Sequence, residues 1–321
     1  AEFTLGSSVS NDGYYNLTVT ATKAGQSVSK EVYFSIQTSS GLSSNKKVIG
    51  YYTNWSQYRP APRSFKPANI DPSLYTHIIY GFADIQNFEI KPFEWNDIKE
   101  WTVGTDWTTP QGHYIDVVNM KTINPNLKVL ISVGGWNFND PNYTQLSTHG
   151  GESAAWIFST MSASSTHRKT FIDSVITLCR DYGFDGIDID WEYPGIEGRN
   201  VRKDGGAISD DYQNFTTLLQ EFRVAFQKES METGQEELLL SIAVAAGRSN
   251  TSGYDFGGFT QYLDWIGLMT YDYHGAWDNY TGSTAPLDQD SQPGGTFSVK
   301  DTVNMYLNEF GIPANKLILG I

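Results

Sequence analysis

The residues from Phe184 to Gly195 read FDGIDIDWEYPG and place four acidic side chains within eight positions. Asp188, Asp190 and Glu192 are spaced two residues apart, and apolar residues occupy positions 187, 189 and 191. In a β-strand, residues two apart share one face, so the acids would line one face and the apolar side chains the other. Carboxylates that share a site raise one another's pKa. The pattern therefore predicts acid–base chemistry or a metal site instead of a row of solvated surface acids.

The overall composition narrows the class of substrate. The 321 residues include 22 basic and 36 acidic side chains, which gives a formal net charge of −14. This charge argues against nucleic acid or an anionic membrane surface as a partner and is compatible with a neutral or cationic substrate. The 9 Trp, 19 Tyr and 17 Phe residues supply flat apolar rings of the kind that sugar-binding clefts use. The longest apolar run, at residues 238–246, has the length of a strand, so no membrane span is expected.

Seven short apolar stretches alternate with helical stretches from Lys47 onward, and they must position the acids. They read KVIGYY, HIIYGFADI, KVLISVG, FDGIDID, LLLSIAVA, WIGLMTY and KLILGI. Between them, residues 209–230 have apolar side chains at helical spacing, with Ser209 as the expected cap. The single cysteine, Cys179, falls in another expected helix as a buried apolar side chain. Near-continuously apolar strands that alternate with helices indicate a parallel sheet, which closes into a barrel when eight units are present.

Residues 1–40 follow a different pattern. Stretches such as YYNLTVTATK and KEVYFSIQ alternate in the manner of strands, and Gly13 and Gly25 are expected to mark turns. An immunoglobulin-like sandwich needs about seven strands and about 100 residues, so we interpret residues 1–40 as the C-terminal part of such a module. Residues 41–46 are expected to be a Ser/Gly-rich linker, and residues 47–321 the catalytic domain. The predicted architecture is an α/β fold, a TIM (β/α)8 barrel with seven strands in this chain, the eighth missing, and part of an N-terminal β-sandwich domain.

Three motifs, in this order along the chain, resemble those of the family 18 glycoside hydrolases, the chitinases. Residues 132–135, SVGG, resemble the S-x-G-G of the family's third strand. The run from Asp185 to Glu192 is similar to the D-x-x-D-x-D-x-E signature of the fourth strand, and residues 269–272, MTYD, resemble the M-x-Y-D of the sixth. The resemblance spans residues 47–321. It implies a hydrolase that cleaves the β-1,4 bonds between N-acetylglucosamine units of chitin with retention, with no cofactor and no metal.

The resemblance also implies a role for each acid. Glu192 follows the fourth strand, where barrel enzymes place catalytic groups, and would be the general acid and base. In this family the substrate's own N-acetyl carbonyl attacks the anomeric carbon. Asp190 would then bind the acetamido N–H and stabilise the oxazolinium intermediate, while Asp188 would share a proton with Asp190 and so keep Glu192 protonated near neutral pH. Asp185 breaks the alternation and is interpreted as structural, with a bond to backbone near the start of the strand.

Further side chains are expected to bind the sugar. By the family likeness Tyr271 is a catalytic residue that donates to the acetamido oxygen, Asp272 helps to hold the sugar, and Trp277 could stack on the leaving-group side. The remaining expected cleft residues are Tyr51, Trp55, Phe82, Trp136, Tyr193 and Met269. Core packing is an open alternative for each aromatic residue. Gly134 and Gly135 are instead expected to let the third strand pass close beside the fourth, where a β-carbon would crowd the acids.

Three alternatives to the chitinase stay open at this point. An endo-β-N-acetylglucosaminidase acting on N-glycans would keep the same acid signature. A chitin-binding lectin would bind the sugar without cutting it, although such family members lack the acid that Glu192 supplies here. A metal-dependent hydrolase could use Asp188, Asp190 and Glu192 as ligands for a hard cation, but no histidine lies beside the acids in the sequence.

The partners and location of the protein are predicted from the same features. The expected partner is chitin or a chito-oligosaccharide. Because the substrate is a polymer and a sandwich module adjoins the barrel, we expect an extracellular, multimodular protein that is secreted or attached to the cell surface. A barrel with seven strands leaves its first and seventh strands as open edges. We therefore expect a companion fragment of the same enzyme to supply the eighth strand and complete the barrel.

Overall fold

The computed structural model describes residues 13–23, 26–36, 46–99, 112–139, 157–195, 210–289 and 297–321. It divides into two compact units, Ala1–Lys47 and Val48–Ile321, which are described separately. In the first unit β1 (Gly13–Lys23) pairs antiparallel with β2 (Gln26–Ile36). This hairpin agrees with the alternating pattern, although Gly13, expected in a turn, is the first residue of β1. The β-sandwich assignment stays a prediction, and residues 41–45 of the expected linker lie outside the described residues.

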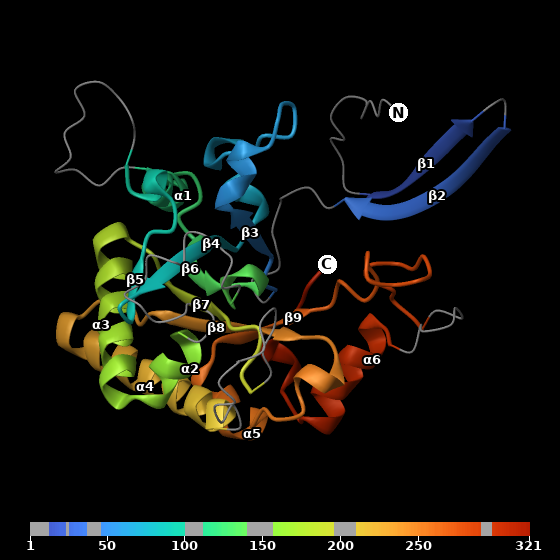
Figure 1. Cartoon of the computed structure of the whole chain (residues 1–321). Helices are drawn as coiled ribbons and strands as arrows, with labels where there is room; N and C mark the ends of the chain where they lie inside the picture. Colours follow the sequence, from blue (N-terminus) through green and yellow to red (C-terminus); the bar gives the residue numbers. More distant parts are fainter. Residues whose placement is uncertain are drawn as a thin grey trace. The chain divides into compact units, whose positions relative to one another are not determined.

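The second unit is a curled sheet of seven parallel strands, as the sequence predicts (Figure 1). The strands are β3 (Ile49–Thr53), β4 (His77–Gln86), β6 (Lys128–Gly134), β7 (Gly186–Asp190), β8 (Leu239–Ala245), β9 (Trp265–Met269) and β10 (Leu317–Leu319). They are hydrogen-bonded in chain order, with β3 and β10 at the two ends of the path, and β5 (Glu89–Lys91) adds antiparallel to β4. The predicted TIM-barrel class of the catalytic domain is therefore confirmed.

Helices cover the outer face of this sheet (Figure 1). The α-helices of the described residues are α1 (His113–Val118), α2 (Ile157–Ala163), α3 (Ser165–Tyr182), α4 (Asp211–Thr233), α5 (Phe256–Phe259) and α6 (Val299–Asn304). The Ser164 hydroxyl caps α3 by accepting from the backbone N–H of His167, and Gly183 ends this helix in the left-handed conformation. Cys179 is fully buried within α3, as predicted.

Helix α4 (Asp211–Thr233) covers nearly all of the predicted helical segment 209–230. The expected cap Ser209 lies outside the described residues, and the side chain of Asp210, which precedes the helix, makes no capping bond. The helix extends to Thr233 and ends at Gly234, where the backbone is left-handed.

Within the described part of the chain, no helix is long and apolar enough to span a membrane.

Short turns connect the strands to the helices at the end of the sheet where the acids lie. These turns include η1 (Asn54–Tyr58), η6 (Trp136–Asn139) and η10 (Arg248–Asn250). Because β-strands in a parallel sheet all point the same way, the loops after β3, β6, β7, β8 and β9 meet at one edge of the sheet. Residues far apart in sequence are thereby brought to one place.

The alternation in the fourth barrel strand directs its apolar residues outward, as predicted. Ile187 and Ile189 are fully buried in the core between sheet and helices. Trp191 follows them and lies between Phe158 of α2, on which its ring stacks at 5.2 Å, and Phe215 of α4, which it meets edge-on at 5.4 Å. Burial of these large apolar side chains fixes the register of β7, and with it the direction of the acids on the opposite face.

Candidate active site

Asp188 is the deepest of the three acids, and three hydroxyl groups hold it. Its Oδ2 accepts from the Tyr51 hydroxyl at 3.0 Å and from the Ser132 hydroxyl at 2.9 Å, and its Oδ1 accepts from the Ser241 hydroxyl at 2.7 Å. Ser132, Asp188 and Ser241 lie side by side in register on β6, β7 and β8. Burial raises the pKa of Asp188, and the three hydroxyl donors oppose that rise because they favour the carboxylate.

Asp190 lies two residues further along the same face and has a different environment. It is 7% exposed, and its Oδ1 is buried without a hydrogen-bond partner among the described residues. Burial, followed by the charges of Glu192 and Asp188, raises the pKa of Asp190 well above its ordinary value. The neutral form of Asp190 is therefore favoured in the free protein, which leaves a proton stored beside Glu192.

Glu192 lies two residues beyond the end of β7 and is buried except for 8% of its surface. Burial raises the pKa of its carboxyl to about 7, and the nearby charge of Asp272 adds to the rise. Hydrogen bonds from the Tyr193 side chain and from the backbone N–H of Trp136 partly offset these effects. A carboxylic acid with this pKa can hold a proton and also release it near neutral pH, which general acid–base chemistry requires.

The residues after β9 face the same acids. Burial raises the pKa of the Tyr271 phenol, as do the charges of Asp190, Glu192 and Asp272, so Tyr271 is a hydrogen-bond donor throughout the ordinary pH range. Asp272 has a φ of 56°, a left-handed backbone that is uncommon outside glycine. This backbone follows directly on Tyr271 and brings two successive polar side chains to the site.

Two glycines, the last residue of β6 and the one after it, allow the close approach of this strand to the acids. Gly134 has a φ of +117°, and a β-carbon built on it would lie 2.0 Å from the backbone oxygen of Asp190. The next residue, Gly135, has a φ of +88°, and its N–H donates to the same oxygen at 2.8 Å. A β-carbon there would lie 2.9 Å from the ring of Phe82. The prediction that these glycines admit the backbone of the third strand beside the acids is confirmed.

Replacing Gly134 with alanine is therefore expected to destabilise the protein by at least about 3 kcal/mol, because the new methyl group overlaps a backbone atom and the backbone is also strained. Chemical denaturation would measure this loss. Gly234→Ala is the matched control, since Gly234 is also left-handed but no atom lies within 4 Å of its β-carbon position. The control is expected to lose only about 1–2 kcal/mol, and equal losses in the two variants would contradict the steric explanation.

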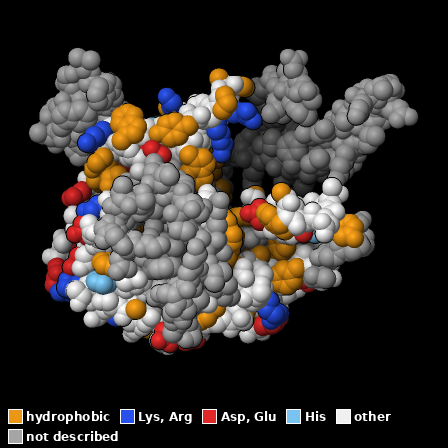
Figure 2. Space-filling view, in the orientation of Figure 1, with side chains coloured by type: hydrophobic (Ala, Val, Ile, Leu, Met, Phe, Trp, Pro, Cys, Tyr) orange, Lys and Arg blue, Asp and Glu red, His pale blue; other side chains and the backbone are white. Residues whose placement is uncertain are grey.

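The expected aromatic cleft residues are largely exposed. Trp55 is 44% exposed and stacks on Phe82 with ring centres 5.9 Å apart. Trp136 and Trp277 are also exposed, and Trp277 packs over the Cα of Gly275. Figure 2 shows apolar side chains reaching the surface at several places on the face drawn. Exposed flat rings on the loops that follow the strands suit a sugar chain, and their contact with substrate stays a prediction.

The other expected binding residues lie nearer the acids. Tyr51 combines a half-exposed ring with a hydroxyl bonded to Asp188. Met269, the last residue of β9, is partly buried. Tyr193 is partly buried, and its hydroxyl bonds to Glu192 and to the side chain of Asn250. The structure therefore gives Tyr193 an intramolecular contact with the acid, in addition to any contact with substrate.

Three polar residues of the site were not assigned a role from the sequence. Ser132 was noted only as part of a motif, and Ser241 and Asn250 were not noted at all. A signal existed for Ser241, because it is the single polar residue in the apolar run LLLSIAVAA. A lone hydroxyl in a buried strand must find a partner, and its position on the inner face points it at Asp188. No comparable signal exists for Asn250, which lies in a loop.

Asp185 lies at the opposite end of β7 and is structural, as predicted. Its Oδ2 accepts from the backbone N–H of Val129 at 2.6 Å and pairs with the ammonium group of Lys121 at 2.5 Å. The fourth acid of the FDGIDIDWEYPG stretch thus fixes the start of the strand and takes no part in the site.

The described residues contain no group of three or more His, Cys, Asp or Glu side chains arranged to hold a metal ion.

Comparison with known protein families agrees with this geometry. The family model described as "Glycosyl hydrolases family 18" matches residues 47–321. Among curated proteins, chitotriosidase-1 of Mus musculus is 36% identical over 279 residues, which make up 86% of this chain and 52% of that protein. The chain spans about half the length of this relative.

Solved structures give the same result. Chitinase ChiA74 from Bacillus thuringiensis is similar with a TM-score of 0.73 and 31% identity, over 86% of this chain and 48% of that one. Human YKL-39, described as a pseudo-chitinase with retained chitooligosaccharide binding properties, is similar with a TM-score of 0.67 and 33% identity. That similarity covers 86% of this chain and 66% of the YKL-39 chain.

Proposed function

The chain belongs to glycosyl hydrolase family 18, and we propose that it is a chitinase that cleaves β-1,4 bonds between N-acetylglucosamine units with retention of configuration. The observation that supports this most is the buried row Asp188, Asp190 and Glu192 at the carboxyl end of the fourth barrel strand. The row ends in a carboxyl group whose pKa burial raises to about 7. A protonated acid at this place is what departure of a glycosidic oxygen needs.

Glu192 is the general acid in this proposal. It protonates the glycosidic oxygen as the N-acetyl carbonyl oxygen of the substrate attacks the anomeric carbon, and the bond from that carbon to the leaving oxygen breaks. The product of this step is a cyclic oxazolinium ion and a free sugar hydroxyl. Glu192, now a carboxylate, takes a proton from a water molecule. That water attacks the anomeric carbon from the face that the leaving oxygen occupied and opens the oxazolinium ring. The two displacements together retain the configuration.

Asp190 and Asp188 support the positive intermediate. Asp190 accepts from the acetamido N–H and carries the negative charge that stabilises the oxazolinium ion. Its proton must leave for that to happen, and the neighbouring carboxylate Asp188 is the group proposed to share it. Three hydroxyl donors, from Tyr51, Ser132 and Ser241, stabilise negative charge on Asp188 whenever it gives the proton up. Tyr271 donates to the acetamido oxygen and orients it, and Asp272 helps to hold the sugar.

Chitin and chito-oligosaccharides are the proposed substrates. The exposed rings of Trp55, Trp136 and Trp277 suit the apolar faces of successive sugars, and the similar proteins described above carry chitinase names. Action on a polymer outside the cell is the proposed setting. The hairpin β1–β2 is proposed to belong to a sandwich module of the same extracellular enzyme.

Two other functions compete with this one. A carbohydrate-binding protein without activity is a real alternative within the family, as the name given to YKL-39 indicates, but Glu192 is present here and has the environment of an acid. An endo-β-N-acetylglucosaminidase would use the same acids on N-glycans. The exposed aromatic rings favour a linear polymer of identical sugars.

Side-by-side assays distinguish these functions. Purified protein is incubated with chitin hexasaccharide, with a high-mannose glycoprotein and with each substrate after Glu192→Gln replacement, and the products are identified by mass spectrometry. Cleavage of the hexasaccharide alone, abolished by the replacement, supports the chitinase. Cleavage of the glycoprotein alone would favour the endoglycosidase, and binding of hexasaccharide without products would favour the lectin. The anomer released first, read by NMR, tests retention.

The proposed acid predicts a pH dependence. Glu192 is active as an acid only when protonated, and burial raises its pKa to about 7, so its active form is present below that pH and is lost as the pH rises through it. We expect kcat/KM on a chito-oligosaccharide to fall with an alkaline limb near pH 7. A profile that is flat from pH 6 to about pH 9 would contradict the assignment.

A further inference from the structure

The loop that carries the general acid is clamped by one aromatic ring. Tyr212, in the first turn of α4, lies between Gly195, three residues after Glu192, and Gly253, in the loop after β8. A β-carbon at Gly195 would lie 2.2 Å from the Tyr212 ring, and a β-carbon at Gly253 would lie 2.0 Å from it. The ring therefore occupies a slot that exists only because both of its walls are glycine.

A buried carboxylate beside this ring fastens the same loop. Asp211 is 3% exposed, and its Oδ2 accepts from the Ser159 hydroxyl of α2 at 2.7 Å and from the backbone N–H of Gly195 at 3.4 Å. Gly195 has a φ of +70°, so its backbone takes a left-handed turn where the carboxylate and the ring meet it. Two successive residues of α4 thus hold one residue of the acid-bearing loop.

The loop that contains Gly253 also carries a residue that lies near the general acid Glu192. Gly253 follows η10, whose last residue is Asn250. The Asn250 side chain and the Glu192 carboxyl both interact with the Tyr193 hydroxyl and shift its pKa in opposite directions. Because the Tyr212 ring contacts both Gly195 and Gly253, it sets the separation of the two loops that carry these interacting side chains.

Ordinary packing of a helix end would not require this arrangement. Packed interiors leave few voids, and the Tyr212 ring fills the space beside two glycines, where a β-carbon on either one would overlap it. The neighbouring Tyr254 ring meets Tyr212 at 5.6 Å, and burial raises the pKa of Tyr254 well above its usual value. The Tyr212 ring therefore contacts Gly195, Gly253 and Tyr254, so a displacement of the ring would be felt by both loops.

We propose that Tyr212, aided by Asp211, is a positioning residue for the general acid: it fixes the segment from Glu192 to Gly195 against the loop that carries Asn250, and so sets the direction and burial of the Glu192 carboxyl. The inference rests on the proposed function for its catalytic meaning, and on the loop contacts alone for its structural part. Placement errors of about 1 Å can cost on the order of 100-fold in rate, so a loosened clamp has a measurable effect.

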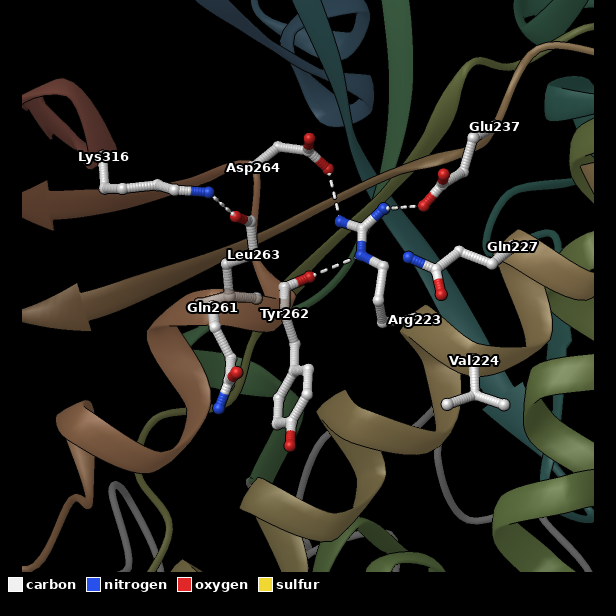
Figure 3. Close-up of a pocket in the computed structure, with 9 residues that line it drawn as sticks. All are labelled: Arg223, Val224, Gln227, Glu237, Gln261, Tyr262, Leu263, Asp264 and Lys316. Atoms are coloured by element: carbon white, nitrogen blue, oxygen red, sulfur yellow. Dashed lines mark hydrogen bonds and ion pairs between the residues drawn. The ribbon is translucent and has the colours of Figure 1, made fainter.

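A matched control is available on the same helix. Figure 3 shows Arg223 of α4 in a cavity of about 390 Å³, where its guanidinium group donates to Glu237, to Asp264 and to the backbone oxygen of Tyr262. Glu237 and Asp264 precede β8 and β9, so this cavity lies at the opposite end of the strands from Glu192. Arg223 forms ion pairs with Glu237 and Asp264 there, so these contacts connect α4 to the residues that precede β8 and β9 and have a structural role. Arg223→Met therefore serves as a control that lowers the stability of the protein but leaves the contacts of Tyr212 with Gly195 and Gly253 intact.

The test compares Tyr212→Ala, Tyr212→Phe and Arg223→Met with the wild type. In Tyr212→Ala we expect kcat on chitin hexasaccharide to fall about 10-fold or more while KM changes by less than about 3-fold. Because burial is the main cause of the raised pKa of Glu192, greater solvent access should also move the alkaline limb to lower pH. Tyr212→Phe keeps the ring and should retain the wild-type rate and profile. Arg223→Met should lower the melting temperature only.

Hydrogen exchange of the Gly195 amide, measured without substrate, separates the inference from the proposed function. We expect Tyr212→Ala to speed this exchange at least about 10-fold, and Tyr212→Phe and Arg223→Met to leave it unchanged. If Tyr212→Ala fails to fold, Gly253→Ala serves as a second variant. It drives a methyl group into the Tyr212 ring and should give the result expected for Tyr212→Ala. A wild-type protein that is inactive on chitin would refute the proposed chitinase function. The hydrogen-exchange measurement would still test whether Tyr212 holds the Gly195 backbone in place. Unchanged exchange together with an unchanged pH profile in Tyr212→Ala or Gly253→Ala would overturn the inference.

Discussion

Replacing Glu192 with glutamine is expected to lower kcat on chito-oligosaccharides by at least about 100-fold while oligosaccharide binding is retained. Glutamine has nearly the same shape but cannot donate a proton to the glycosidic oxygen or take one from water. The side chain is 8% exposed and its pKa is raised to about 7, so below that pH the neutral amide replaces a group that is itself protonated. Steady-state kinetics and calorimetric titration with a chitin hexasaccharide measure the two quantities.

Unfolding has to be distinguished from loss of the acid. Burial disfavours the charged form of Glu192 and so raises its folded pKa to about 7, which means that the folded state loses stability as the pH rises from the unfolded pKa of this carboxyl toward about 7. Glutamine avoids the buried charge, so Glu192→Gln should be at least as stable as the wild type at pH 8. Glu237→Gln removes a carboxylate from the cavity of Figure 3 and should leave kcat unchanged. A Glu192→Gln enzyme that turns over near the wild-type rate would show that the acid lies elsewhere.

The barrel was predictable because its strands are buried on both faces and carry a local signal. Runs such as KVLISVG and LLLSIAVA are apolar, short and bounded by turn residues, so their type and order can be read without knowing their neighbours. The inner face of β7 was predictable for a related reason. The two-residue period of Asp188, Asp190 and Glu192 is a local property, and burial of Trp191 between α2 and α4 enforces it.

The supporting residues were not predictable, because their roles depend on which strands and loops become neighbours. Ser241 matters only because the register of β8 places it beside Asp188. Tyr212 resembles any other aromatic residue of an amphipathic helix until Gly195 and Gly253, more than fifty positions apart in the chain, are brought to its two sides. Tertiary contacts, which leave no periodic trace, decide both roles.

Replacing Asp190 with asparagine is expected to lower kcat on the order of 100-fold, by a different route from the loss of Glu192. Asparagine can still accept a hydrogen bond from the acetamido N–H, but it cannot become negative when positive charge develops on the oxazolinium ion. Burial and neighbouring carboxylates hold the wild-type carboxyl neutral in the free protein, so the replacement should change the ground state little. We expect KM to change by less than about 3-fold and most of the loss to fall in kcat.

The pH profile and one altered substrate decide whether this loss reflects substrate assistance. The charge of Glu192 helps to raise the pKa of Asp190 in the wild type, so a second ionisation accompanies that of Glu192. In Asp190→Asn the alkaline limb should reflect the ionisation of Glu192 alone. If Asp190 were instead a covalent nucleophile, an oligosaccharide without the acetyl group on the sugar at the cleaved bond would still be hydrolysed by the wild type. Substrate assistance requires that this compound resist cleavage, because the attacking carbonyl is then absent. Wild-type activity of Asp190→Asn across the pH range, or hydrolysis of the deacetylated compound at the normal rate, would contradict the mechanism while leaving Glu192 as the acid.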